Sequence, residues 1–211
     1  MVDAVLTLNA GSSSIKFSLF EVDGTASRAP RLASHGEIEG IGSAPHFVVR
    51  DLSGAILAEQ RWPDSHQAFP SLLEAVIGWA EGHLGADRLI AVGHRVVHGG
   101  PDHYRPERAT AALLDALDRL TPLAPLHEPH NIAPIRAIAA ARPNLLQVAC
   151  FDTAFHHTMP KVATRFALPR EYEQAGVRRY GFHGLSYEYI AGRLREIAPD
   201  LAKGRVIAAH L

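Results

Sequence analysis

The sequence predicts an α/β domain built on a mixed β-sheet, and three observations lead to that prediction. Several segments near the start alternate apolar and polar residues with the two-residue period of strands. Further along, segments with helical spacing alternate with apolar strand-like segments, as in βα units. The chain has 211 residues, of which 47% are hydrophobic and 20% charged, so it can fill one large core or two small ones.

The first part of the chain is expected to be mostly strand. Residues 2–9 and 15–22 alternate on either side of a Gly- and Ser-containing turn at 10–14, which is typical of a β-hairpin. Glycines and prolines separate three further expected strands, at 32–41, 46–51 and 55–62.

Helices and strands are then expected to alternate. Apolar residues at helical spacing predict a helix over 69–83 that ends at Gly85. The expected elements that follow are a strand at 89–97, a helix at 107–120, a Pro- and His-rich loop at 121–134, a helix at 132–141 and a buried strand at 144–151.

The last part is expected to be irregular over 159–184 and helical over about 186–197. Residues 205–211 have the pattern of a buried strand. Because chain ends usually lie at the surface, an end on a buried strand suggests that the sequence is a fragment.

Composition argues against several classes of protein. With 21 Lys and Arg against 22 Asp and Glu, the net charge is −1, so no nucleic-acid partner is expected. No apolar run approaches the roughly 18 residues that cross a membrane. A single cysteine and the lack of a signal-peptide pattern predict a cytoplasmic location.

The turn after the first expected strand is a candidate phosphate site. Backbone N–H groups around Gly11 could cradle an anion, with the neighbouring serine hydroxyls and Lys16 as additional donors. The segment lacks the P-loop pattern, and an ordinary solvated hairpin turn explains the same residue types better when they are considered alone.

The segment Gly93 to Gly100 is a candidate carboxylate site. In a strand, Arg95 and Val97 share a face, so the guanidinium could bind a small carboxylate while the valine covers its apolar tail. A surface arginine near a turn is equally compatible. His94 and His98 lack a third ligand nearby, which disfavours a metal site.

The segment 122–131 contains His127-Glu128-Pro129-His130, which superficially matches the zinc-protease helix motif. It is one residue too short, and Pro129 would interrupt such a helix, so we reject that interpretation. Two alternatives remain: a rigid loop that presents Leu126 and His127 to a cleft, or the start of a helix.

Two further positions could take part in phosphate chemistry. Asp152 follows an apolar strand, where a carboxylate can hold Mg²⁺. His183 lies between glycines at the start of a helix and could donate to developing negative charge, although helix capping alone also explains its neighbours. His156 and His157 are expected to pack or hydrogen-bond. An anion loop, an arginine, a metal carboxylate and a donor histidine together suit phosphoryl transfer.

Four segments of the chain, 8–17, 93–100, 151–156 and 180–184, resemble the acetate kinase family, and the resemblance extends over the whole sequence. It implies the superfamily of acetate and sugar kinases, actin and Hsp70. The expected domains are a ribonuclease-H-like domain at 1–152 with a mixed sheet and flanking helices, and the incomplete start of a nucleotide-binding domain at 153–211.

The resemblance also implies an activity and its participants. Members of this family transfer a phosphoryl group reversibly between ATP and acetate, giving ADP and acetyl phosphate. The implied metal is Mg²⁺, with Mn²⁺ as an alternative. The implied state is a cytoplasmic homodimer of the full-length enzyme.

Site residues follow from the resemblance position by position. The implied catalytic residues are Arg95, Asp152 and His183, and Arg95 also binds the acetate carboxylate. The acetate methyl pocket would consist of Val97, Leu126 and Phe182. Phosphate or ATP would contact Asn9, Ser12, Ser14, Lys16 and His210, and the metal would lie near Asn9 and Asp152.

The sequence departs from the family pattern in two places. The phosphate motif that begins at His210 is cut after Leu211, so the isolated chain is expected to be inactive. Glu128 stands where the family usually has asparagine. Two alternatives to acetate kinase stay open: a kinase for propionate or another short-chain acid, and a non-catalytic truncated relic that still binds a ligand.

Overall fold

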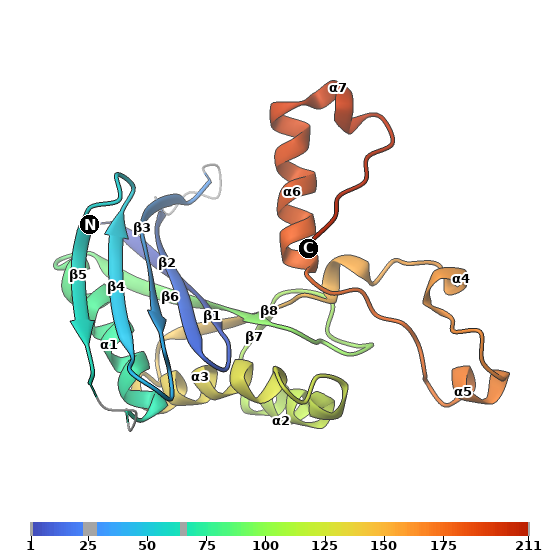
Figure 1. Cartoon of the computed structure of the whole chain (residues 1–211), viewed down its shortest axis with the longest axis horizontal. Helices are drawn as coiled ribbons and strands as arrows, with labels where there is room; N and C mark the ends of the chain where they lie inside the picture. Colours follow the sequence, from blue (N-terminus) through green and yellow to red (C-terminus); the bar gives the residue numbers. More distant parts are fainter. Residues whose placement is uncertain (1, 23–28, 64–66, 211) are drawn as a thin grey trace. The chain divides into compact units, whose positions relative to one another are not determined.

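Within the described residues, eight strands form one sheet in the order β5-β4-β3-β2-β1-β6-β8-β7 (Figure 1). Antiparallel pairing joins β1 through β5 in succession, whereas β6 runs parallel to β1, so the sheet is mixed as predicted. The strands are β1 (Asp3–Ala10), β2 (Ser14–Val22), β3 (Arg31–Glu39), β4 (His46–Asp51), β5 (Ile56–Arg61), β6 (Arg88–Val96), β7 (Glu107–Arg108) and β8 (Leu146–Phe151).

This computed structural model describes residues 2–22, 29–63 and 67–210. Its contacts divide the chain into two units, which are described separately. Unit 1 consists of Met1–Val96 with Glu107–Ala149, and unit 2 of Val97–Pro106 with Cys150–Leu211. The expected domain boundary at residue 152 stays a prediction.

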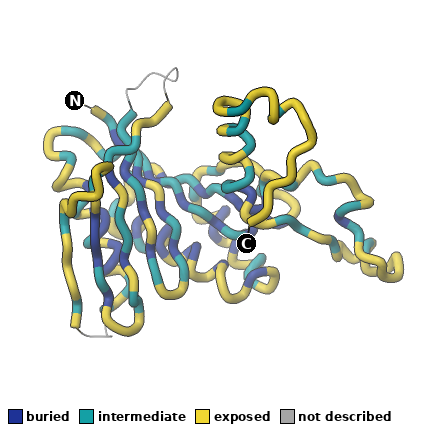
Figure 2. Tube along the Cα trace, turned by 45° about the horizontal axis from the view of Figure 1, so that its top comes forward, coloured by how far each residue is buried: buried dark blue, intermediate teal, exposed yellow. Residues whose placement is uncertain are grey.

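The core of unit 1 lies between one face of the sheet and two helices, α1 (Phe69–Leu84) and α3 (Glu128–Ala141) (Figure 1). Every second residue of β1 is buried on that face, namely Ala4, Leu6, Leu8 and Ala10. The same alternation of buried and more exposed residues continues along β2 and β6 (Figure 2). The two-residue period therefore leaves the intervening side chains of β1 on the opposite face.

The expected helix over 107–120 is wrong in its first turn. Glu107 and Arg108 form β7, which pairs antiparallel with the middle of β8. The helix α2 (Ala111–Leu120) begins after Thr110, whose side chain accepts a hydrogen bond from Leu113 N at 3.2 Å. A threonine that caps a helix satisfies an otherwise unpaired N–H group, so it fixes the helix start at this position.

The expected loop at 121–134 is also wrong. It contains a short 3-10 helix, η1 (Thr121–Leu123), and the first half of α3. Pro129 lies in the first turn of α3, where a proline removes no helical hydrogen bond. Pro134 lies inside the helix, and burial of Ile132, Ile135 and Ile138 offsets the bond that it removes.

Unit 2 contains the 3-10 helix η2 (Ala154–His156) and four helices: α4 (Lys161–Thr164), α5 (Arg170–Gln174), α6 (Gly184–Ile197) and α7 (Pro199–Ala202). The segment expected to be irregular, 159–184, therefore includes α4 and α5. The expected terminal strand is wrong over the described residues 205–210, which pair with no strand, and Ile207 is 95% exposed. Leu211 lies outside the described residues. None of the described helices combines the length and the apolar character needed to cross a membrane.

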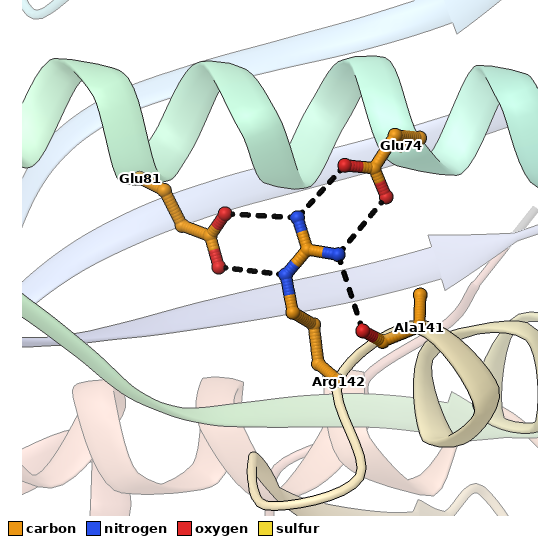
Figure 3. A network of polar contacts seen from close by, with 4 residues as sticks. All are labelled: Glu74, Glu81, Ala141 and Arg142. Carbon is orange, nitrogen blue, oxygen red and sulfur yellow. Dashed lines mark hydrogen bonds and ion pairs between the residues drawn. The ribbon is translucent and has the colours of Figure 1, made fainter.

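An arginine clamp joins the end of α3 to α1 (Figure 3). The guanidinium of Arg142, which follows α3, donates to both oxygens of Glu81 at 3.0 Å and to both oxygens of Glu74 at 2.7 and 3.2 Å. Hydrogen bonds from Glu81 and Glu74 raise the pKa of Arg142 above its ordinary value. Two carboxylates therefore hold one planar cation from two sides, a geometry that lysine cannot reproduce.

We predict that Arg142→Lys lowers the free energy of unfolding by about 1 kcal/mol, because a single ammonium replaces a guanidinium held on two sides. Urea denaturation would measure the loss. The matched control is Arg136→Lys, which should lose less, since Arg136 hydrogen-bonds Asp118 at 2.6 Å and has Asp115 only at 4.0 Å. Equal losses in the two variants would contradict the role given to the clamp.

A buried polar chain links β6, β8 and α3. His94 is 2% exposed, and its Nε2 lies 2.9 Å from Gln147 Oε1, while Gln147 Nε2 donates to the Ile135 carbonyl at 3.2 Å. Since the glutamine amide donates to Ile135, its oxygen faces the imidazole, and His94 must donate through Nε2. Burial lowers the pKa of His94 to about 4, so the ring is neutral at physiological pH.

This burial predicts a pH-dependent stability. Between pH 6.5 and 4 the unfolded chain takes up a proton at His94 while the folded chain does not, so the folded state loses stability as pH falls. The loss amounts to about 3 kcal/mol across this window. Equilibrium unfolding of the wild type and His94→Gln at several pH values would measure it, because glutamine does not titrate. Identical pH slopes for the two proteins would contradict the prediction.

Candidate functional site

The candidate residues of unit 1 gather at one end of β1 and its neighbours. Asn9 and Lys16 are directly opposite each other in the β1–β2 register, and both lie on the face that α1 and α3 do not cover. Arg95 belongs to the same face of β6, because β6 pairs in parallel with β1 and His94 is buried on the other side. The alternation of three strands thus gathers an amide, an ammonium and a guanidinium on the face that points away from α1 and α3.

Arg95 and Asn9 are in direct contact. Arg95 Nη1 donates to Asn9 Oδ1 at 3.0 Å, and both side chains are partly buried. Lys16 is more exposed, and its Nζ lies 3.8 Å from a carboxylate oxygen of Glu37. The guanidinium is therefore held in position, whereas the lysine has the freedom of a surface side chain.

The turn between β1 and β2 is closed by backbone and side-chain hydrogen bonds. Gly11 N donates to the Ser14 carbonyl at 2.8 Å, and Asn131 Nδ2 donates to the Ala10 carbonyl at 2.8 Å. Ser12 is exposed and Ser14 begins β2. Asn131 is buried in the first turns of α3 and fixes the backbone next to Asn9, a role that no sequence pattern indicated.

The segment before α3 agrees with the helix-start interpretation. His127 occupies the N-cap position of α3, and Leu126, the residue before it, is 76% exposed. Glu128 is fully buried in the first helical turn. A carboxylate in the first turn interacts favourably with the positive end of the helix dipole.

The candidate residues of unit 2 lie on its first loop and around Asp152. Val97 begins that loop, because β6 ends at Val96. His98 is 1% exposed, its Nδ1 accepts a hydrogen bond from Gly100 N at 2.8 Å, and its ring meets Tyr180 and Phe182 edge-on. Burial lowers the pKa of His98. This histidine is therefore a neutral packing residue.

Asp152 and Gly184 are joined through the backbone. Asp152 directly follows β8 and is 1% exposed, and its carbonyl accepts a hydrogen bond from Gly184 N at 2.8 Å. A β-carbon at position 184 would lie 2.1 Å from that carbonyl oxygen, so only glycine permits this approach. The next residue, Thr153, accepts a hydrogen bond from Gly99 N through its Oγ1 at 3.0 Å.

His183 has an unusual backbone. Among the described residues it is the one non-glycine residue with positive φ, at 55°, and it is the N-cap of α6. Its ring stacks on that of His210, with the centroids 4.0 Å apart. Phe182 is 40% exposed. A non-glycine residue in the left-handed region carries strain, which is concentrated at functional sites in proteins.

The two candidate metal ligands, one in each unit, carry the oxygen atoms that a hard divalent cation prefers. The described residues contain no group of three or more His, Cys, Asp or Glu side chains placed to hold a metal. Mg²⁺ in phosphate-transferring enzymes needs no such group, because it binds one or two carboxylates, with phosphate oxygens and water completing its shell. The buried Asp152 and the Asn9 amide oxygen are ligands of the required kind.

The predicted site residues thus form two sets. Unit 1 contains Asn9, Ser12, Ser14, Lys16, Arg95 and Leu126, and the structure joins Arg95 to Asn9 directly. Unit 2 contains Val97, Asp152, Phe182, His183 and His210, and the structure stacks His183 on His210.

Comparison with known proteins gives consistent matches over the whole chain. A model of the acetokinase family matches residues 4–211. An acetate kinase of Rhodopseudomonas palustris is 50% identical over 212 residues, which cover all of this chain and 53% of that relative. An acetate kinase of Deinococcus radiodurans is 44% identical and is covered over 50% of its length. The chain therefore spans about half the length of the curated relatives it matches.

Solved structures agree with these matches. The crystal structure of Porphyromonas gingivalis acetate kinase aligns with a TM-score of 0.77 and 32% identity, covering 93% of this chain and 49% of that one. A propionate kinase from Francisella tularensis aligns equally well, at 31% identity. The predicted fold, an actin-like domain with a mixed sheet, is thereby confirmed. The chain belongs to the acetokinase family.

Proposed function

We propose that the full-length protein containing this chain transfers a phosphoryl group reversibly between ATP and acetate. A carboxylate oxygen of acetate forms the new bond to the γ-phosphorus as the bond to the bridging oxygen of ADP breaks. Acetate is already ionised at neutral pH, so no side chain has to remove a proton. Catalysis then consists of positioning and of stabilising charge in the transition state.

Arg95 carries this proposal. In the proposed reaction, the Arg95 guanidinium binds the acetate carboxylate and then stabilises the negative charge that develops on the transferred phosphoryl group. Its 3.0 Å hydrogen bond to Asn9, on the uncovered face of the sheet, supports this role because an arginine that is already oriented loses little freedom when it binds an anion. Val97, Leu126 and Phe182 would surround the methyl group, and the exposure of Leu126 and Phe182 suits side chains that receive a ligand.

The remaining residues would hold the phosphates. Ser12, Ser14 and Lys16 provide donors at the turn after β1, which Gly11 and Asn131 close. His183 and His210 would donate to the transferred group. Asp152 and Asn9 would hold Mg²⁺, with Mn²⁺ as the alternative because it accepts the same oxygen ligands. When bound, the metal would neutralise charge on the phosphate oxygens.

Two further properties of the full-length protein belong to this proposal. We expect it to work in the cytoplasm as a homodimer, without a nucleic-acid or membrane partner. The near-zero net charge of this chain supports the absence of a nucleic-acid partner, because binding the polyanionic nucleic-acid backbone requires an extended basic surface.

A second substrate is favoured by one observation, the close structural match to a propionate kinase. One methylene changes transition-state binding by only about 1–3 kcal/mol in an apolar pocket. Turnover on acetate, propionate and butyrate would rank the three acids. The non-catalytic alternative concerns the 211-residue chain by itself, and it would be supported if that chain binds acetate but forms no acyl phosphate.

The test of the proposed function traps acetyl phosphate with hydroxylamine in the presence of ATP, acetate and Mg²⁺. The full-length protein should form the hydroxamate. We predict that Arg95→Ala lowers kcat by about 100-fold or more, since it removes a charge that stabilises the transition state. Val97→Ala should cost about tenfold in kcat/KM, because it removes only apolar contact. Small and equal effects of both substitutions would contradict the role of Arg95.

The backbone of His183 generates a separate prediction. His183→Gly and His183→Ala both remove the imidazole, so both should lose most of the kinase activity. The glycine variant should nevertheless be about 1 kcal/mol more stable than the alanine variant, because only glycine adopts φ near 55° without strain. Chemical denaturation would measure the difference. An alanine variant as stable as the glycine variant would show that this backbone is not strained.

A further inference from the structure

Two turns of unit 2 are attached to each other at several points. The first runs from Asp152 through η2, and the second, residues 180–184, precedes α6. The hydrogen bond from Gly184 N to the Asp152 carbonyl joins one end of each turn. A second attachment involves His156, which has no assigned role in the proposed reaction.

His156 holds the second turn by a hydrogen bond to the backbone. Its Nε2 lies 2.9 Å from the carbonyl oxygen of Phe182. A carbonyl oxygen only accepts hydrogen bonds, so the imidazole must carry its proton on Nε2 and donate it. The position of His156 is itself fixed, because His156 N donates to the Thr153 carbonyl and its own carbonyl accepts from Met159 N.

The ring of His156 also packs against the backbone of the second turn. A β-carbon at Gly181 would lie 2.3 Å from His156 Cγ, closer than any real contact. Glycine at 181 thus leaves room for the imidazole to lie on the chain. On another side the ring meets Tyr187 of α6 edge-on, with centroids 5.7 Å apart. Contact on both sides restricts the ring to this orientation.

The Phe182 carbonyl, which accepts the hydrogen bond from His156, is linked to the backbone conformation of His183. The peptide plane between Phe182 and His183 contains the Phe182 carbonyl, and its orientation sets φ of His183. That φ is 55°, a value that persists in a non-glycine residue only where the surroundings impose it. The hydrogen bond from His156 acts on one side of His183, and the bond from Gly184 to Asp152 acts on the other.

We propose that His156 is a positioning residue, which orients Phe182 and His183 for phosphoryl transfer through its Nε2 hydrogen bond to the Phe182 carbonyl. The inference rests on the proposed function for its effect on catalysis. His156 itself touches no substrate in this scheme. It acts through one peptide group, whose rotation would move the Phe182 and His183 side chains together.

The neighbouring His157 provides a matched control. Its Nδ1 lies 2.8 Å from the carbonyl of Ala154 in its own turn, and its ring stacks on Tyr104. Both of these contacts lie outside residues 180–184. Replacing either histidine by phenylalanine keeps an aromatic ring and removes one hydrogen bond. His156→Phe loses the bond to residues 180–184, whereas His157→Phe loses a bond within its own turn.

The experiment compares His156→Phe, His156→Gln and His157→Phe in the full-length protein. His156→Phe should lower kcat by about 10- to 100-fold, since a misplacement of about 1 Å can cost that much. KM for ATP should change far less than kcat, because in the proposed scheme this turn meets the transferred phosphoryl group and the acetate methyl, while Ser12, Ser14 and Lys16 hold the other phosphates. His156→Gln should recover much of kcat, as its Nε2 can reach the same carbonyl. His157→Phe should retain wild-type kinetics.

Hydrogen exchange provides a readout that is independent of the activity. In His156→Phe, the Gly184 amide should exchange at least about tenfold faster than in wild type, while His157→Phe should leave it unchanged. Equal kinetics and equal exchange in both phenylalanine variants would overturn the proposal, as would a glutamine variant as impaired as His156→Phe. If the wild type forms no acetyl phosphate, the proposed function fails, whereas the exchange data still decide whether His156 holds the turn.

Discussion

The site residues of unit 1 depend on one constraint, the burial of alternate β1 residues beneath α1 and α3. Leu6 and Leu8 are buried on that side, and burial of each such side chain contributes about 1.5–3 kcal/mol. A shift of one residue in register would expose this apolar set and bury Asn9. Stability of the core therefore also fixes which side chains of β1, β2 and β6 face away from the helices. Strand alternation alone is therefore enough to place Asn9 and Arg95 on the face that points away from α1 and α3.

Unit 2 positions its candidate residues in a different way, through backbone contacts. Gly181 and Gly184 let a ring and a carbonyl approach the main chain more closely than any β-carbon would allow. The candidate side chains Phe182 and His183 lie between these glycines, so neighbouring peptide groups decide where they point. Under the proposed function, residues that never meet a ligand would therefore affect the reaction. The same contacts hold His183 in a left-handed conformation that it would rarely adopt in an unfolded chain.

Most of the fold could be predicted from the sequence, because strand and helix periods reflect burial directly. The expected strands over 2–62 formed within two residues of their expected ends, and α1 stopped at Gly85 as predicted. The predictions were wrong where the place of a residue within a helix or sheet matters more than its type. Pro129 and Pro134 suggested a loop, yet a proline in a first helical turn costs nothing, and buried isoleucines carry the helix past the second. The pattern at 205–210 suggested a strand, but a strand also needs a partner, which no local pattern reveals.

The positions of single candidate residues were more predictable than the contacts that hold them. Alternation correctly placed Arg95 opposite the buried side of β6, and the spacing of Asp152 after β8 matched its position at the strand end. The contribution of Asn131 depends on a contact across 121 residues, which periodicity cannot show.

The two glutamates around Arg142 have a consequence for behaviour on heating. Water solvates charged groups less favourably as the temperature rises, so bringing ions together becomes less costly, while apolar burial gains little further. The ion pairs between the end of α3 and α1 should accordingly contribute a growing part of the free energy of unfolding as the temperature rises. Relatives adapted to hot habitats could extend this cluster with additional charges along α1 without altering the apolar interior.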